Sequence, residues 1–302
     1  MSIVCVFGGT GFLGRSIMRR LGAQGATVRI AVRSPDRVRK VFHGSERDRI
    51  EAVRADVRER ASVAAAVAGA DAVVNAVSAY VEKNGITFEA VHVRGARTVA
   101  EEAAAAGVGR LVLVSGIGAD ADAPSPYIRA RGRGERAVRE TFPGATVIRP
   151  SAMFGPGDAL FGTLADIVRL SPVLPLIGAH TRLQPVFVDD VAEAIARLLE
   201  RPDSAGNTYE LGGPRAYTLR ELAELTLRLL DRRRLLLPVP FAIADIQARL
   251  LELLPHPPLT TGQVDLLRAD NVASGALPGL RELGIRPKSV EDTVPDDLSR
   301  TR

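Results

Sequence analysis

The chain has 302 residues, of which 46% are hydrophobic and 25% charged, so its composition is that of an ordinary globular protein and not of a disordered or fibrous one. One cysteine, Cys5, excludes an internal disulfide framework, and the four histidines lack the spacing of metal ligands, so we expect no metal site. The formal net charge of +5 is dispersed among alternating acidic and basic residues, which argues against a nucleic-acid-binding surface.

The sequence contains no pattern typical of a signal peptide or of a membrane-spanning helix. Ile3–Phe7 is a short apolar run that glycines follow directly. The longest apolar region, Ala61–Val81, is interrupted by Asp71 and Asn75 and is interpreted as a helix followed by a strand. We therefore expect a cytoplasmic protein, with peripheral attachment to the inner face of the membrane as an alternative.

The first 150 residues alternate short β-branched runs with helical patterns, which is typical of a parallel sheet covered by helices. Strands are predicted at Ile3–Phe7, Thr27–Val32, Ile50–Arg54, Ala72–Ala76, Leu111–Val114 and Ala145–Ile148. Helices are predicted over residues 11–23, 35–42, 59–68, 85–106 and 126–141. These six strands predict an α/β fold with a doubly wound, parallel Rossmann sheet.

The pattern changes after Pro150. Residues 151–188 carry glycine and proline at short intervals and are interpreted as a loop-rich cap. A helix is then predicted to begin at Val191 with Asp190 as its cap, and a short strand follows at Thr208–Leu211. The remainder mixes short helices with proline breaks.

These patterns predict two domains. Residues 1–150 form the Rossmann domain, 189–211 return to it, and 151–302 form a smaller, irregular domain that holds a substrate or contacts a partner. Within the smaller domain, hydrophobic residues recur at helical spacing at Ile243, Ile246, Leu250 and Leu254. We expect this helix to pack on its own domain; the alternative is a surface for a bilayer or a membrane-protein partner, aided by the arginines at 232–234.

A glycine-rich segment joins the first predicted strand to the first predicted helix. Gly8 permits a tight turn, Gly11 lets the backbone approach a pyrophosphate, and Gly14 allows the helix to pack closely on the sheet. The N-terminus of a helix favours negative charge, and its backbone N–H groups are free to bind phosphate. The segment therefore predicts a dinucleotide-binding site formed by Gly8, Thr10, Gly11, Phe12, Leu13 and Gly14.

The residues after the second strand select the cofactor. NAD sites place an acid there to bond the ribose 2′-OH, whereas a 2′-phosphate requires a cation. This strand is followed by Arg33 and then Arg37, and a guanidinium suits a phosphate, so NADP(H) is favoured over NAD(H). Asp36 keeps NAD(H) open. Because only three of the 40 basic residues are lysine, 37 are arginine, and Arg33 is also open to interpretation as an ordinary surface residue.

The ends of the third and fourth strands border the same site, since ligands bind beyond the carboxyl ends of parallel strands. Asp56 and Val57 are expected at the adenine edge, and Asp56 has the alternative of capping the next helix. Asn75, Ala76, Val77 and Ser78 are expected beside the ribose and nicotinamide.

Further motifs follow the glycine loop in a fixed order. They are Tyr127–Glu135, Arg149–Gly155, Gln184–Val191 and Tyr209–Pro214. Together with the loop they resemble atypical and extended short-chain dehydrogenases/reductases, in particular bacterial relatives of the NADPH-binding accessory subunit of respiratory complex I. Members implicated in ubiquinone biosynthesis share much of this pattern. The resemblance implies bound NADPH and a partner in respiratory complex I or at a membrane surface.

Active members of this superfamily use a serine, a tyrosine and a lysine, the last two spaced Y-x-x-x-K on one helix. The resemblance assigns these roles to Ser115, Tyr127 and position 131, which here is Arg131. Arginine keeps the positive charge but cannot readily release a proton, so cofactor binding should survive better than the proton relay. The resemblance also implies that Pro150 and Phe154 form a wall beside the nicotinamide.

Two functions remain open. The first is a complex I accessory-type protein that holds NADPH tightly with weak or no turnover. The second is an active NADPH-dependent oxidoreductase or epimerase acting on a carbonyl through Ser115, Tyr127 and Arg131. An interaction protein without nucleotide is disfavoured because the glycine loop is intact. Substrate identity and oligomeric state are not encoded in any motif.

Overall fold

The computed structural model describes residues 2–44, 46, 50–83, 85–254 and 259–294. The chain divides into two compact units. The larger, the Rossmann unit, comprises residues 1–150, 188–210 and 275–285. The smaller, the C-terminal unit, comprises residues 151–187, 211–274 and 286–302.

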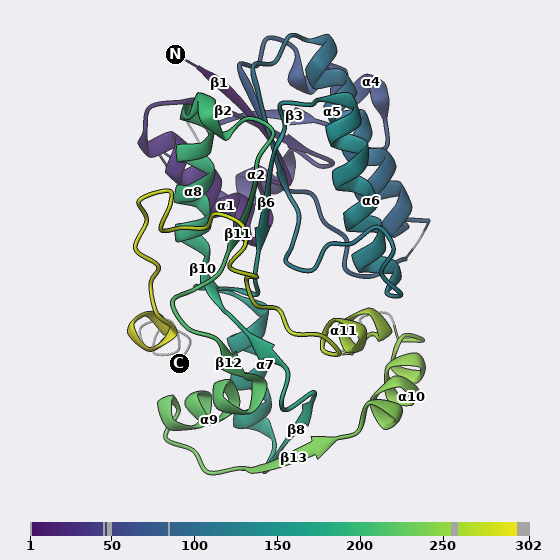
Figure 1. The fold of residues 1–302 in the computed structure, drawn as a ribbon, viewed down its shortest axis with the longest axis vertical. Helices are drawn as coiled ribbons and strands as arrows, with labels where there is room; N and C mark the ends of the chain where they lie inside the picture. Colours follow the sequence, from purple (N-terminus) through teal and green to yellow (C-terminus); the bar gives the residue numbers. More distant parts are fainter. Residues whose placement is uncertain (1, 45, 47–49, 84, 255–258, 295–302) are drawn as a thin grey trace. The chain divides into compact units, whose positions relative to one another are not determined.

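A seven-stranded sheet forms the centre of the Rossmann unit (Figure 1). Its strands are β1 (Ile3–Phe7), β2 (Thr27–Val32), β3 (Ile50–Arg54), β4 (Ala72–Asn75), β5 (Arg110–Val114), β6 (Thr146–Pro150) and β11 (Thr208–Leu211). Their order is β11-β6-β5-β4-β1-β2-β3, and from β6 to β3 adjacent strands run parallel. The expected doubly wound Rossmann sheet is therefore present, and β11, from the strand predicted at Thr208–Leu211, forms its edge beside β6. The order reverses between β1 and β4, and such a switch point is where this fold binds ligands.

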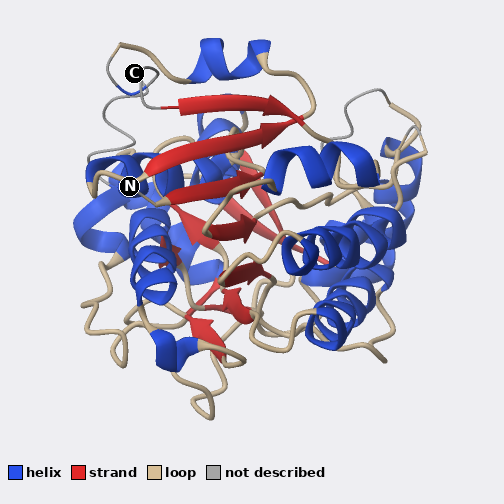
Figure 2. Ribbon diagram, turned by 90° about the horizontal axis from the view of Figure 1, so that it is seen from above, coloured by secondary structure: helices blue, strands red, loops and turns tan. Residues whose placement is uncertain are grey.

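Helices cover both faces of this sheet (Figure 2). They are α1 (Phe12–Ala23), α2 (Asp36–Val41), α4 (Arg60–Val67), α5 (Ala96–Ala105), α6 (Pro126–Thr141) and α8 (Val188–Glu200), with a π-helix η1 (Glu89–Gly95) and a 3₁₀ turn η2 (Pro202–Ser204). The helix predicted over 85–106 is thus a π-helix that continues into α5. The predicted cap at Asp190 is wrong, because α8 begins at Val188 and Asp190 lies in its first turn.

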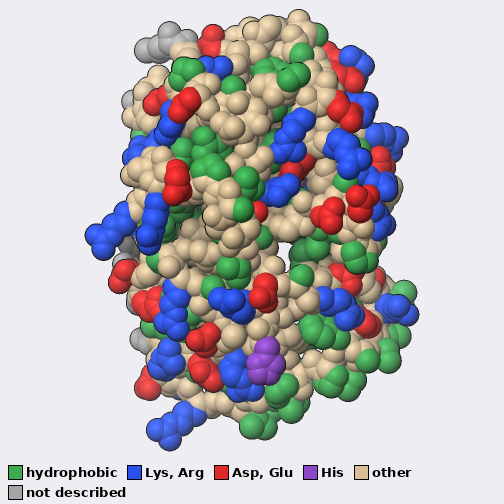
Figure 3. Space-filling view, in the orientation of Figure 1, with side chains coloured by type: hydrophobic (Ala, Val, Ile, Leu, Met, Phe, Trp, Pro, Cys, Tyr) green, Lys and Arg blue, Asp and Glu red, His purple; other side chains and the backbone are tan. Residues whose placement is uncertain are grey.

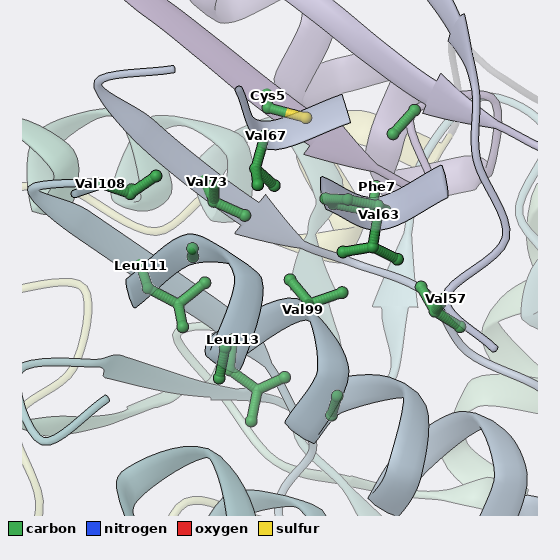
Figure 4. Packing of buried hydrophobic residues seen from close by; sticks show 14 of the residues in the cluster. Cys5, Phe7, Val57, Val63, Val67, Val73, Val99, Val108, Leu111 and Leu113 are labelled. Carbon is green, nitrogen blue, oxygen red and sulfur yellow. The ribbon is translucent and has the colours of Figure 1, made fainter. Parts of the chain in front are cut away.

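One hydrophobic core lies between the sheet and the helices α4 and α5 (Figure 4). Val63 of α4 and Val99 of α5 are fully buried against Val73 of β4 and Leu111 of β5. These side chains come from apolar runs that are continuous in the strands and periodic in the helices, as a sheet covered on both faces requires. This core fixes the carboxyl ends of the strands in place.

The C-terminal unit is built from short elements. They are β7 (Met153–Phe154), α7 (Ala159–Leu170), β8 (Val173–Ile177), β9 (Arg182–Leu183), β10 (Val186–Phe187), β12 (Tyr217–Thr218), α9 (Leu219–Leu229), β13 (Leu235–Val239), α10 (Phe241–Leu251) and α11 (Thr261–Leu266). The strands form three two-stranded sheets, β10-β7, β12-β9 and β13-β8. No helix among the described residues is long and apolar enough to cross a membrane.

The loop-rich cap predicted over 151–188 is wrong in one respect, because it contains the twelve-residue helix α7. The carboxylate of Asp158 accepts a hydrogen bond from the Phe161 amide at 2.7 Å and so caps the helix. Phe161, Leu164 and Val168 are buried at helical spacing. The glycines and prolines on either side hid this pattern.

Candidate functional site

A cavity of about 730 Å³ opens at the carboxyl ends of the central strands, entirely within the Rossmann unit. Many of the predicted cofactor residues line it: Gly8, Thr10, Gly11, Arg33, Arg37, Asp56, Val57, Ala76 and Val77. The structure therefore brings together residues from four strand ends that are far apart in sequence. Ser78, expected beside the ribose and nicotinamide, also lines the cavity, as does Arg58, which was not among the predicted cofactor residues.

The glycine loop is pressed tightly between β1, β4 and α1. Gly8 has φ +82°, and a Cβ there would lie 2.7 Å from the carbonyl oxygen of Ala76. A Cβ on Gly14 would lie 2.2 Å from the carbonyl oxygen of Gly8. Helix α1 begins after Gly11, and no side chain caps its first N–H groups. Thr10 and Gly11, which line the cavity, directly precede these donors, and uncapped N–H groups at a helix start suit an anion.

Three arginines line the part of the cavity that lies beyond the ends of β2 and β3. Arg33 and Arg37 are exposed, and neither makes an ion pair with a carboxylate of the described residues. Arg58 instead binds Asp56 through two side-chain hydrogen bonds, of 2.7 and 3.0 Å. These bonds hold the pKa of Asp56 below its ordinary value. Cationic charge therefore gathers in this part of the cavity, and guanidinium groups suit a phosphate.

The alternative interpretation of Asp56, as the cap of the next helix, is wrong. Glu59 occupies the N-cap position of α4, whereas Asp56 accepts from the backbone and side chain of Arg58. The signal that could have identified Arg58 is its place in the loop after a predicted strand, two residues beyond Asp56. Asp36, which left NAD(H) open, is the first residue of α2 and does not line the cavity.

The predicted tyrosine and arginine meet on α6. Arg131 Nε donates to the phenol oxygen of Tyr127 at 2.7 Å, and Arg131 Nη2 donates to Ser78 Oγ at 3.0 Å. Both side chains of the pair are buried. Since Ser78 lines the cavity, it joins this pair to the nucleotide site. Arg131 Nη1 is buried and has no hydrogen-bond partner among the described residues.

Aromatic rings surround Tyr127. Tyr80 stacks on it with centroids 5.5 Å apart, and Phe88 and His92 meet it edge-on at 5.4 Å. His92 Nε2 lies 2.9 Å from the carbonyl oxygen of Ala79, which lines the cavity. Sequence analysis missed His92 and Phe88, because the periodicity of an α-helix does not reveal which residues a π-helix turns inward. π-Helical turns are themselves frequent at functional sites.

Burial dominates the protonation of this cluster. It raises the pKa of Tyr127, and the charge of Arg131 opposes the rise only in part. It lowers the pKa of His92 to about 4, and the charge of Arg131 acts in the same direction. For Arg131 burial lowers the pKa, but Tyr127, Tyr80 and Glu135 together outweigh this effect, so the pKa is raised and the guanidinium stays charged. At neutral pH the cluster thus holds a neutral phenol, a neutral imidazole and a cation.

The other predicted site residues lie in different surroundings. Ser115 follows β5, and its buried Oγ has no partner among the described residues. Asn75 is buried and accepts from the Val77 amide at 3.2 Å, so it shapes the turn that lines the cavity. Pro150 ends β6. Phe154 lies in the C-terminal unit, fully buried against two other phenylalanines.

Phe12 and Leu13 are the first residues of α1 and do not line the cavity. A dinucleotide fits this set of residues: uncapped N–H groups for the pyrophosphate, arginines at the adenosine end, and a buried guanidinium nitrogen without a partner near the other end. The roles of the individual residues remain predictions.

Residues 8–202 match a family described as NAD(P)H-binding. The chain is also 33% identical over 305 residues to "NADH dehydrogenase [ubiquinone] 1 alpha subcomplex subunit 9, mitochondrial" of Rattus norvegicus, covering 99% of this chain and 80% of the relative. The chain belongs to the NAD(P)H-binding family. Its resemblance to the complex I accessory subunit, expected from the motifs, is thereby confirmed.

A further relative of this NAD(P)H-binding protein and one solved structure of the same fold are informative. A "Ceramide reductase" of Caulobacter vibrioides is 33% identical over 201 residues, covering 66% of this chain and 62% of that protein. The Citrobacter sp. triphenylmethane reductase, solved with NADP(H), has the same fold, with a TM-score of 0.77 at 18% identity over 98% of this chain and all of that one. At that identity the likeness establishes the fold only.

Proposed function

We propose that this protein binds NADP(H) in the cavity and holds it with weak or no turnover, as an accessory or quinone-related protein. The observation that carries the proposal is the contact of Arg131 with Tyr127. The glycine loop of the nucleotide site is complete, but Arg131 stands in the position of the lysine that relays a proton, and a guanidinium does not readily release one.

The preference for NADP(H) over NAD(H) rests on charge. Arg33 and Arg37 line the cavity after β2 without an acidic partner among the described residues, and the cavity-lining Asp56 is already bound by Arg58. A 2′-phosphate would gain charge-assisted hydrogen bonds there, worth about 1.5–3 kcal/mol each. Removing one of these arginines should therefore weaken NADPH binding by about tenfold or more.

The test compares the dissociation constants of NADPH and NADH for the wild type, Arg33→Ala and Arg39→Ala. Arg39 is an exposed arginine on α2, the helix that follows Arg33, but it does not line the cavity and so serves as the matched control. Arg33→Ala should weaken NADPH binding and leave NADH binding unchanged. An equal loss for both nucleotides would refute the phosphate assignment.

Weak turnover follows from the state of Tyr127. A bound nicotinamide supplies or accepts a hydride. The neutral phenol can donate a proton to a substrate carbonyl, but its raised pKa makes it a poor acid, and Arg131 cannot restore the proton afterwards. The guanidinium still holds the phenol oxygen in place, so a substrate could be bound and oriented without efficient chemistry.

The experiment measures NADPH oxidation with carbonyl substrates, quinones included, for the wild type, Arg131→Lys and Tyr127→Phe. We expect low activity in the wild type, a gain in Arg131→Lys and none in Tyr127→Phe. Nucleotide retained through purification reports tight binding independently. Rapid wild-type turnover that Tyr127→Phe abolishes would overturn the non-catalytic proposal.

A second candidate is an active reductase or epimerase acting on a carbonyl. It is supported by the buried, unpartnered Oγ of Ser115, which is suited to bond a carbonyl oxygen, and by the similarity to a protein named ceramide reductase. In that case Ser115→Ala should lower kcat while NADPH binding stays unchanged.

We also propose association with a respiratory complex I-type assembly, on the basis of the relatives named as its subunits. Affinity purification from membranes tests this: co-purified complex I subunits support the proposal, and a protein recovered without them contradicts it.

A further inference from the structure

Helix α10 buries two alanines and exposes three of its large aliphatic residues. Ala244 and Ala248 are fully buried in a cluster with Val264 of α11. By contrast, Ile243, Ile246 and Leu250 are 49%, 61% and 63% exposed. The expectation that this helix packs its large apolar face on its own domain is therefore wrong. The buried alanines, with Phe241 partly buried beside them, pack against Val264 of α11. The three larger aliphatic side chains face solvent.

The exposed stripe continues beyond α10. Leu253 and Leu254 extend it at helical spacing, and on β13 the alternating Leu235 and Leu237 are also exposed. We call these residues the apolar patch: Leu235, Leu237, Ile243, Ile246, Leu250, Leu253 and Leu254. Hydrophobic side chains gather over α10 and β13 in Figure 3. Soluble monomers rarely expose so many large aliphatic residues in one segment, and such patches mark interaction sites.

The charges around the patch are mostly positive. Arg232 and Arg233, before β13, and Arg249, on α10, are exposed and make no ion pair with any carboxylate of the described residues. Asp231, beside Arg232, is exposed and makes no ion pair among the described residues, whereas two other acids of the segment are engaged elsewhere. Asp245 binds the guanidinium of Arg268 at 2.6 Å, and Glu252 accepts from the amide and hydroxyl of Thr261. The patch therefore combines bare aliphatic side chains with unpaired cations.

We propose that the apolar patch inserts into the surface of a membrane that contains anionic lipids. Aliphatic side chains enter the boundary of the acyl chains, and arginines beside them bind lipid phosphates, which is the pattern of a helix lying in the interface plane. A second copy of the chain fits less well, because a symmetric contact over the patch would place Arg249 and its neighbours against their own equivalents. The proposal concerns the C-terminal unit and does not depend on the nucleotide site.

Vesicle flotation with the full-length chain tests this. The vesicles are phosphatidylcholine, with or without phosphatidylglycerol. The apolar variant is Ile246→Gln with Leu250→Gln, and the charge variant is Arg232→Gln with Arg233→Gln. Leu277→Gln is the matched control, an exposed leucine in the Rossmann unit. Unchanged melting temperatures and NADPH binding show that each variant is folded.

We expect the wild type and Leu277→Gln to float with the anionic vesicles, and both patch variants to bind them about tenfold more weakly or worse. Added salt should weaken wild-type binding. The proposal is overturned if the wild type binds no vesicles, if the apolar variant binds as well as the wild type, or if binding does not depend on phosphatidylglycerol. It is also overturned if the wild type dimerises through this face instead and the apolar variant is monomeric.

Discussion

Acidification should destabilise the protein through His92. Burial lowers the pKa of this imidazole from its ordinary 6.5 to about 4. Since the unfolded chain keeps the ordinary value, it binds a proton between these two pH values while the folded chain does not. The free energy of unfolding therefore falls as the pH drops from about 6.5 to about 4 and is unaffected by this group above 6.5. The difference of about 2.5 pKa units corresponds to about 3 kcal/mol.

The assay is urea unfolding of the wild type and His92→Gln at a series of pH values. Carboxylates titrate in both proteins, so the contribution of His92 is the difference between their pH profiles. His180→Gln, which removes an exposed histidine, is the matched control and should follow the wild type. His92→Gln should be less stable at pH 7, because it loses ring contacts with Tyr127, but should lose less stability on acidification. Parallel profiles for the wild type and His92→Gln would refute the reasoning.

Two further predictions concern packing and charge. Gly14→Ala places a Cβ 2.2 Å from the Gly8 carbonyl oxygen and should weaken NADPH binding by about tenfold or more. The control is Gly22→Ala on the same helix, where a Cβ would meet nothing within 4 Å and binding should not change. Calorimetric titration measures the binding of both variants. Glu135→Gln removes a buried carboxylate that pairs with Arg149 at 2.7 Å and should cost about 2–3 kcal/mol in urea unfolding. The exposed Glu140→Gln should change stability by less than about 0.5 kcal/mol, and equal losses for the two variants would contradict the prediction.

Most of the Rossmann sheet could be predicted because its strands are continuous apolar runs separated by helical patterns. Ile3–Phe7, Thr27–Val32 and Ile50–Arg54 have the bounds that the sequence indicated. Helix α7 was missed because flanking glycines and prolines dominate its local signal, although Asp158 is a good cap. The orientation of α10 could not be predicted either. Alanines and leucines both fit an apolar face, and only the neighbouring α11 decides which of them is buried.

The candidate site was predictable where one local motif carries it. The glycine loop and Arg33 follow strand ends, and strand ends meet in this fold. The surroundings of Tyr127 were not predictable, because Phe88 and His92 reach it from a different helix. The bond between Arg131 and Ser78 likewise joins residues 53 positions apart. Such contacts depend on tertiary packing and leave no trace in local periodicity.

A crystal structure of the protein grown with NADPH tests the proposed nucleotide site most directly. We predict diphosphate density against the backbone N–H groups at the start of α1, with the 2′-phosphate within hydrogen-bond distance of Arg33. Nucleotide density elsewhere, or a 2′-phosphate turned away from both Arg33 and Arg37, would contradict the proposed site.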